Sequence, residues 1–352
     1  MTRRRISVAL GGAPLLAPLL FGAETQSRNR LGVCTYSYNI HWKAARDGNP
    51  KARFKDPLEF LEYCHGLGAG GVQIGLGSRD AAYAAKVRAK AETYGMYFEG
   101  QVSLPQNDSD AALFDSDIRA AREAGAEVVR AAMLSGRRYE TFDSVEAFRQ
   151  FAEKSWQRLT LAEPIVRKHR VKLAVENHKD WRVTEQLEML KRLGSEYVGI
   201  NVDTGNNLAL LEDPMETVDA LAPFAFTTHL KDMAVQQYQE GFLLSEVPLG
   251  EGFLDLNRII ERLRKANSNI RFNLEMITRD PLRIPCLTEK YWVTLTGVPA
   301  SALAGALAMI HQHSSKTPLP QTSGLDADQQ LELEDSHVRR SFAYARERSG
   351  LG

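Results

Sequence analysis

The alternation of apolar runs with amphipathic stretches limits the folds open to this chain more than any other feature. Helical stretches separate the apolar runs, and several begin at Asp or Ser and end at Gly or Asn, the usual helix-boundary residues. Strong apolar strands alternating with helices indicate a parallel sheet covered by helices. We expect strands at residues 31–38, 71–76, 97–104, 127–134, 171–177, 198–203, 225–230 and 271–277.

Eight such units in roughly 250 residues is the count expected of a (β/α)8 TIM barrel in the α/β class. A doubly wound open sheet is the competing fold, but no G-x-G-x-x-G turn directly follows the first expected strand. We therefore predict a barrel at residues 31–277 and a C-terminal helical extension at 278–352. The sequence leaves open whether this extension wraps the barrel or bridges subunits of a homo-oligomer.

The composition is that of an ordinary globular protein, with 25% charged and 43% hydrophobic residues. Lys+Arg and Asp+Glu both number 44, so the net charge gives no case for a nucleic-acid or membrane-surface partner. Cys34, Cys64 and Cys286 are widely spaced and form no CxxC motif, which argues against a disulfide framework and against zinc–thiolate sites.

The pattern of residues 1–26 predicts a twin-arginine-like export signal. A basic start, Thr2-Arg3-Arg4-Arg5-Ile6, precedes an apolar stretch at 8–21 that is too short and too broken for a transmembrane helix. We expect a periplasmic or otherwise exported protein with no membrane attachment after signal removal. A basic N-terminus on a cytoplasmic protein is the alternative.

Four side chains stand at the ends of four successive apolar runs: Glu176, Asp203, His229 and Glu275. The first three are about one βα unit apart, so a closed barrel would bring all four to the C-terminal face, where such folds keep their active sites. Carboxylates suit hard divalent cations, and imidazole suits Mn, Co or Zn. The pattern predicts a site for one divalent metal ion, Mn, Mg, Co or Zn. The alternative is that each carboxylate caps a helix or pairs with Lys or Arg.

The segments AVENHKDW, NVDTGN, THLKD, VPLGEGFLDL and NLEM resemble the sugar phosphate isomerase/epimerase family, the xylose isomerase-like TIM barrels, over about residues 31–277. The resemblance implies one divalent metal bound by Glu176, Asp203, His229 and Glu275. It also implies that Glu176 and Glu275 remove and return a proton next to a carbonyl, through a metal-stabilised enediolate.

Further residues are expected to bind substrate, each with an alternative role. Lys231 could meet an oxyanion or pair with Asp232, and Glu251 could close over the site or cap a helix. Buried arginine needs an anionic partner, and a site carboxylate could be the partner of Arg130. Asn206 stands where ketose 3-epimerases usually carry a histidine. The expected substrate-binding residues are His178, Asn206, Lys231, Glu251, Arg130, His41 and Trp42, of which the last two could instead be core.

No phosphate-binding Gly-rich turn or Arg/Lys cluster is apparent near the strand ends, so a non-phosphorylated sugar or keto-sugar is the expected substrate. The leading interpretation is a metal-dependent isomerase or epimerase. A 3-keto-glycoside lyase or hydrolase, or an inosose-type dehydratase, would use the same site. A non-catalytic sugar-binding barrel with a structural metal is a further alternative. An endonuclease on abasic DNA would need more metal ligands than this chain places.

Overall fold

The computed structural model describes residues 30–77 and 79–352. The export signal expected at residues 1–26 lies outside these ranges. Within them, no helix combines the length and the hydropathy needed to cross a membrane.

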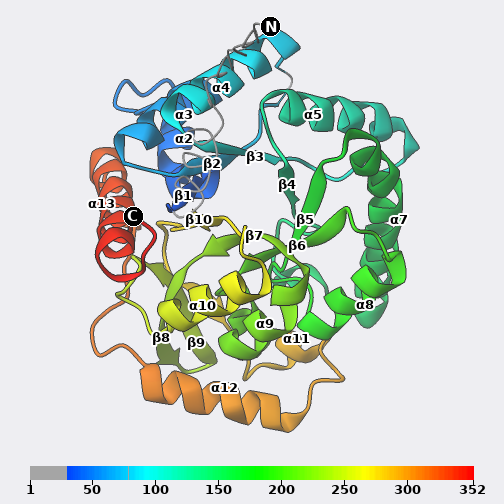
Figure 1. Cartoon of the computed structure of the whole chain (residues 1–352). Coiled ribbons are helices and arrows are strands. Elements are labelled where there is room, and N and C mark those ends of the chain that lie inside the picture. Colours follow the sequence, from blue (N-terminus) through cyan, green and yellow to red (C-terminus); the bar gives the residue numbers. More distant parts are fainter. Residues whose placement is uncertain (1–29, 78) are drawn as a thin grey trace, which may run out of the picture.

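Eight parallel strands form a closed barrel in the order β1-β10-β7-β6-β5-β4-β3-β2, which confirms the (β/α)8 prediction (Figure 1). Closure brings the first strand beside the last, so that Gly32 pairs with Asn273. The barrel strands are β1 (Gly32–Cys34), β2 (Gly71–Ile74), β3 (Tyr97–Gln101), β4 (Val128–Ala131), β5 (Lys172–Glu176), β6 (Val198–Asp203), β7 (Ala225–Leu230) and β10 (Phe272–Leu274).

Helices surround the barrel, and their ends follow local sequence signals (Figure 1). Asp56 and Ser144 accept hydrogen bonds from first-turn N–H groups, and Gly95 and Gly194 end two helices in the left-handed conformation. The helices between barrel strands are α2 (Asn39–Arg46), α3 (Pro57–Gly66), α4 (Ala81–Tyr94), α5 (Ala111–Glu123), α6 (Arg138–Thr141), α7 (Val145–His169), α8 (Val183–Leu193), α9 (Pro214–Leu221) and α10 (Leu256–Ala266). Short 3-10 helices are η1 (Thr35–Tyr38), η2 (Asp108–Asp110), η3 (Asn206–Leu210) and η4 (Ala222–Phe224).

The first strand is shorter than expected, because the chain turns into η1 after Cys34. Ser37 fixes this turn to the end of β10: its hydroxyl donates to the carbonyl of Leu274 at 2.8 Å and accepts from the N–H of Met276 at 3.0 Å. The apolar run continues past the strand because η1 is buried, and periodicity alone does not distinguish the two.

Residues 231–255, which lie outside the eight expected strands, contain an antiparallel hairpin. Its strands are β8 (Asp232–Tyr238) and β9 (Gly241–Val247), and β11 (Leu282–Ile284) extends the sheet. The sheet forms because alternate residues, such as Val235 and Leu244, enter a second apolar cluster together with helix α12 (Ala300–His313).

The C-terminal extension packs on the barrel of its own chain. Besides α12, it contains α11 (Glu289–Trp292) and α13 (Ala327–Arg348), which lies beside α2 (Figure 1). Val338 and Phe342 of α13 belong to the same apolar core as the barrel strands. The N–H of Leu31, just before β1, donates to the carbonyl of Leu351 at 2.9 Å. The structure therefore shows the C-terminal extension wrapped against the barrel of its own chain.

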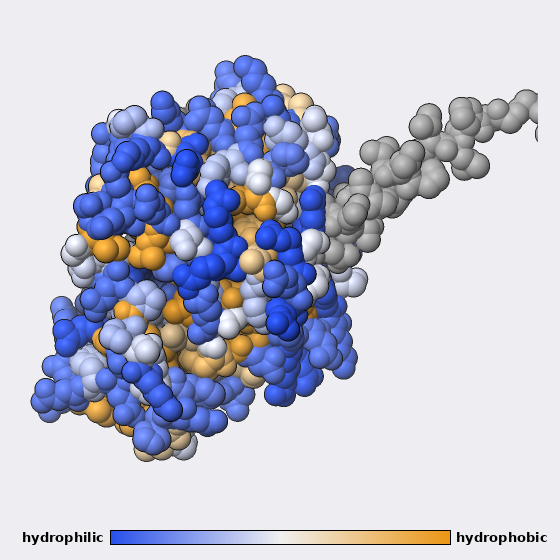
Figure 2. Space-filling model, turned by 90° about the vertical axis from the view of Figure 1, so that its left-hand side faces the viewer, coloured by the Kyte–Doolittle hydropathy of each residue, from blue (hydrophilic) through white to orange (hydrophobic). Residues whose placement is uncertain are grey.

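On the face shown in Figure 2, hydrophilic residues predominate and hydrophobic ones form small groups between them. Among the described residues, the exposed large hydrophobic side chains are Leu113 and Leu287. Scattered exposed hydrophobic residues of this kind are normal for globular proteins.

Candidate metal centre

The four side chains expected to bind a metal converge at the C-terminal end of the barrel. Glu176 and Asp203 are the last residues of β5 and β6, and Glu275 directly follows β10. His229 of β7 pairs in register with Asp203 on one side and with Asn273 on the other. Parallel pairing brings the ends of these strands to one level, so residues nearly a hundred positions apart become neighbours.

The imidazole of His229 faces all three carboxylates. Its Nδ1 lies 3.4 Å from Oε2 of Glu176, 3.8 Å from Oδ2 of Asp203 and 3.1 Å from Oε1 of Glu275. One ligand atom from each of the four lies within 4.8 Å of the others, and all four residues are buried. A single divalent cation has room to contact every one of them.

The tautomer of His229 suits metal binding. Its Nε2 lies 2.7 Å from Oε1 of Gln73, which can only accept, so the ring proton is assigned to Nε2. Nδ1 then faces the carboxylates and can hold either a proton or a metal ion. This buried Nδ1 lacks a hydrogen-bond partner. Buried polar atoms are rarely left so, and a cation between Nδ1 and the carboxylates would satisfy it. The residues present therefore fit a divalent metal.

Charge in the cluster also favours a cation. Burial raises the pKa of Glu176, but Arg130 and His229 bring it down to about 2. Burial likewise raises the pKa of Glu275, yet His229 and Lys231 hold it well below its usual value. Burial lowers the pKa of His229, but Glu275 and Cys34 raise it above the ordinary value. The carboxylates therefore attract positive charge at the position of Nδ1.

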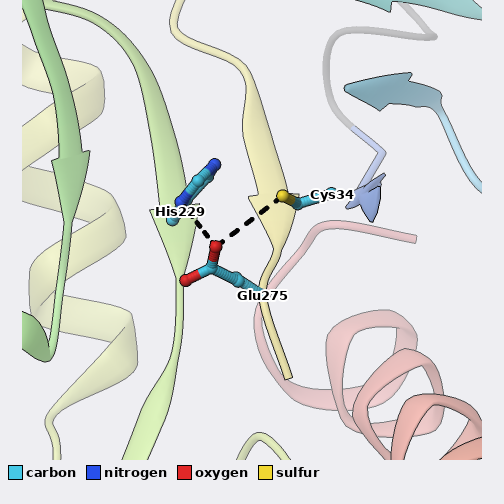
Figure 3. Close-up of side chains that lie close together, drawn as sticks. All are labelled: Cys34, His229 and Glu275. Atoms are coloured by element: carbon cyan, nitrogen blue, oxygen red, sulfur yellow. Dashed lines mark hydrogen bonds and ion pairs between the residues drawn. The ribbon is translucent and has the colours of Figure 1, made fainter. Parts of the chain in front are cut away.

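Cys34 is a free, buried cysteine that lies at the candidate metal centre. Figure 3 shows Cys34, His229 and Glu275 pointing toward one another from β1, β7 and the end of β10. Sγ of Cys34 lies 3.7 Å from Oε1 of Glu275. Burial raises the pKa of Cys34, so the group is a thiol that donates to the carboxylate.

Two cationic residues were expected to bind substrate. In the structure both form ion pairs with the carboxylates of the candidate metal ligands. Nε of Arg130 donates to Oε2 of Glu176 at 2.6 Å, which supplies the anionic partner that a buried arginine needs. Nζ of Lys231 lies 2.6 Å from Oε2 of Glu275 and 2.9 Å from Oδ2 of Asp203. Asp232, the alternative partner of Lys231, instead accepts from backbone N–H groups of the β9–α10 connection.

Other expected substrate-binding residues divide into two groups. His178 and Trp42 line the cavity above the metal centre, and Nδ2 of Asn206 donates to Oε1 of Glu176 at 3.1 Å. Burial, and then Lys179, lower the pKa of His178 to about 3, so its imidazole is neutral near pH 7.

His41 and Glu251 lie elsewhere. Nδ1 of His41 lies 2.9 Å from Oε2 of Glu334 on α13, and neither His41 nor Glu251 lines the cavity. Glu251 is exposed and forms an ion pair with Arg340 of α13. His41, expected to bind substrate with a core role as the alternative, joins α2 to the C-terminal helix in this structure and takes the buried role. Glu251 was expected to close over the site or to cap a helix. In this structure it instead forms the ion pair with Arg340.

Three functional candidates were missing from the sequence prediction. Buried Glu246 of β9 lies 3.7 Å from Nζ of Lys231 and 2.5 Å from Nη2 of Arg279. Lys179 and Arg279 line the cavity. The available signal for Glu246 was its position next to the last residue of the run 241–247, which contains Phe242, Leu243 and Leu244.

Comparison with known proteins identifies the family. Residues 61–294 match the family described as xylose isomerase-like TIM barrel. The chain belongs to the xylose isomerase-like TIM barrel family. A 3-oxo-isoapionate decarboxylase of Pectobacterium atrosepticum is 29% identical over 109 residues, which are 30% of this chain and 40% of that protein. This chain thus matches less than half the length of that relative.

Solved structures of similar fold agree with this family. D-psicose 3-epimerase, solved in the presence of D-fructose, has a TM-score of 0.57 at 14% identity, covering 92% of this chain and all 100% of that one. A magnesium complex of a xylose isomerase-like protein from Mycobacterium smegmatis has a TM-score of 0.52 at 14% identity, covering 79% and 97%. The probable 3-DHS dehydratase AsbF of Bacillus anthracis has a TM-score of 0.51 at 14% identity, covering 70% and 91%.

Proposed function

We propose that this protein is a divalent-metal-dependent isomerase or epimerase that moves a proton next to the carbonyl of a non-phosphorylated sugar or keto-sugar. The observation that supports it is the set of four ligand atoms within 4.8 Å at the barrel mouth. Family members of similar fold include sugar epimerases. A divalent cation held by Glu176, Asp203, His229 and Glu275 would polarise the carbonyl and stabilise negative charge that develops on its oxygen.

In this proposal, Glu176 and Glu275 exchange protons with two faces of the substrate. In the barrel, β6 and β7 separate β5 from β10, so these carboxylates approach the centre from opposite sides. Both have a pKa below the ordinary value, so each is ionised near neutral pH. One would take the proton from the carbon, and the other would deliver a proton received from solvent to the opposite face.

The direct test is hydrogen exchange in D2O. Manganese-loaded protein is incubated with a panel of free ketoses and 3-keto-glucosides, and NMR follows the signal of the hydrogen next to the carbonyl. We expect deuterium at that carbon together with an epimer or isomer, loss of both with EDTA, and recovery with manganese. A panel with no exchange by the metal-loaded protein would contradict the proposal.

A lyase is the second candidate, and the stretch shared with 3-oxo-isoapionate decarboxylase favours it. The same proton removal would then be followed by loss of a leaving group from the next carbon. Incubation with a 3-keto-glucoside separates the two, since a lyase releases the aglycone. Release of the aglycone without any epimerised product would support the lyase and contradict the isomerase proposal.

We also propose that the protein acts outside the cytoplasm. The support is the basic and apolar pattern of residues 1–26. Replacement of Arg3 and Arg4 by Lys should leave the protein in the cytoplasmic fraction of expressing cells, whereas the wild-type chain should reach the periplasm. If the variant and the wild-type chain divide between cytoplasm and periplasm in the same proportion, export through a twin-arginine signal is contradicted.

A further inference from the structure

The cavity above the metal centre is strongly cationic. It encloses about 1180 Å³, and its described lining contains eight Arg or Lys side chains against three carboxylates, those of Asp117, Glu176 and Glu275. The whole chain has equal numbers of both signs, so the excess is local to this cavity. No local pattern predicts this cluster, because its members come from separate loops and strands. A cavity lined by one sign of charge concentrates ligands of the opposite sign.

Three of these cations already have a carboxylate partner within the protein. Arg130 bonds to Glu176, Lys231 to two metal ligands, and Arg279 to Glu246. Their charges are balanced within the protein. A ligand would gain little from them without breaking these pairs.

Lys179 differs from the other inner cations. It is 2% exposed and lines the cavity, yet no carboxylate oxygen of the described residues lies within 4.0 Å of its Nζ. Nζ donates to Oδ1 of Asn206, and Nζ of Lys231 lies 3.2 Å from the same oxygen. Two ammonium groups therefore share one neutral acceptor.

The position of Lys179 is costly without a further anion. Glu246 and Asp203 act on this ammonium only from beyond 4.0 Å, and a single amide does not replace the hydration that the charge loses on burial. Burial, and then the charge of Lys231, lower the pKa of Lys179 to about 8. A negative group arriving from the cavity would supply the missing counter-charge.

Lys179 also lies close to the reacting centre. Asn206, which accepts from Lys179, donates through Nδ2 to Oε1 of Glu176 at 3.1 Å. One amide side chain thus separates the ammonium from a metal ligand. An anion bound by Lys179 would belong to the same small molecule as the carbonyl at the metal.

We propose that the substrate is a sugar acid, and that Lys179 binds its carboxylate in an ion pair. This inference rests on the proposed function, since it takes the carbonyl of the substrate to lie at the metal. A carboxylate matches the single unpaired ammonium in charge, whereas a phosphate monoester brings a charge close to −2. The neighbouring guanidinium of Arg279 is already occupied by Glu246.

The test is calorimetric binding to the manganese-loaded full chain. The probes are matched pairs that differ in the carboxylate: L-threonate and L-threitol, D-arabinonate and D-arabinitol, D-gluconate and D-glucitol, D-galactonate and D-galactitol. We expect at least one acid to bind 10-fold or more tightly than its alditol. Lys179→Met should reduce that preference at least 10-fold, and Lys179→Gln should do the same. The control Lys86→Met, at an exposed position of α4, should retain the preference for the acid.

Each other outcome overturns the inference. Equal binding of acids and alditols would show that no carboxylate is recognised. A preference for acids that survives in both Lys179 variants would assign it to the metal or to another cation of the cavity. Tighter binding of D-glucose 6-phosphate than of every acid, lost on Lys179→Met, would identify a phosphate site instead. Metal-dependent exchange on a neutral ketose with no acid preference would refute only this inference, whereas absence of metal binding would refute the proposed function.

Discussion

Oε1 of Gln73 lies 2.7 Å from Nε2 of His229, and this contact turns Nδ1 of the imidazole toward the three carboxylates of the metal centre. The two residues come from β2 and β7, which are not neighbours in the barrel, so the contact crosses its interior. A partner of this kind fixes both the tautomer and the orientation of a ligand histidine. Gln73 is therefore a positioning residue for the metal.

Gln73→Leu should weaken metal binding by about 10- to 100-fold, because it removes the acceptor that fixes Nε2–H and so frees the imidazole to turn or change tautomer. Competition with a fluorescent manganese chelator measures this affinity. The matched control is Gln186→Leu, a buried glutamine that donates to the carbonyl of Val175 behind the barrel wall. The control should lower stability but keep the metal affinity. An equal affinity in Gln73→Leu and wild type would contradict the role of Gln73.

Glu275→Gln should lower turnover by on the order of 10²- to 10⁴-fold at saturating manganese, since an amide cannot carry the proton. The measurement is the rate of deuterium exchange on the best substrate of the ketose panel. Glu334→Gln changes a buried glutamate that bonds to His41 and does not itself line the cavity. It should cost stability while leaving the exchange rate within a few-fold of wild type. Unchanged exchange in Glu275→Gln would show that this carboxylate does not move the proton.

Stability should fall with rising pH because of Asp180. Burial raises the pKa of this carboxyl to about 7, although N–H groups of Trp181 and Leu134 lower it by donating hydrogen bonds. An unfolded aspartate loses its proton near pH 4. Between about pH 4 and 7 the folded state therefore binds more protons than the unfolded state, and the free energy of unfolding decreases as pH rises.

Asp180→Asn cannot ionise, so its unfolding free energy should change less between pH 5 and pH 8 than that of the wild type. Urea unfolding at the two pH values measures the difference. Asp143→Asn, which changes a side chain that is 82% exposed, serves as the control and should follow the wild-type curve. The same decline in Asp180→Asn as in wild type would contradict the role assigned to Asp180.

The fold and the convergence of the four candidate metal ligands were accessible from sequence because each depends on a local pattern. Barrel strands are buried on both faces, so they appear as apolar runs, and Glu176 and Asp203 stand at the exact ends of two of them. The expected ranges 198–203 and 225–230 coincide with β6 and β7. The one-unit spacing of the ligands followed from the same repeat.

The rest depended on contacts that no local pattern encodes. Gln73 reaches His229 across 156 positions, and His41 reaches Glu334 across 293. The hairpin β8–β9 was missed because its apolar residues pack against α12 rather than against the barrel. Lys179 gave no signal, because its lack of a carboxylate partner is a property of the assembled cavity.

The most direct test of the metal centre is the stoichiometry of manganese bound after stripping with EDTA and reloading. Elemental analysis should find one ion per wild-type chain. The double variant Asp203→Asn, His229→Gln should bind none at the same free metal concentration, while its far-ultraviolet circular dichroism matches that of the wild type. Binding to the wild type should also raise its unfolding free energy, by about 2.7 kcal/mol at a free metal concentration 100 times the dissociation constant. Wild-type protein that binds no metal, or a double variant that still binds one ion, would contradict the account.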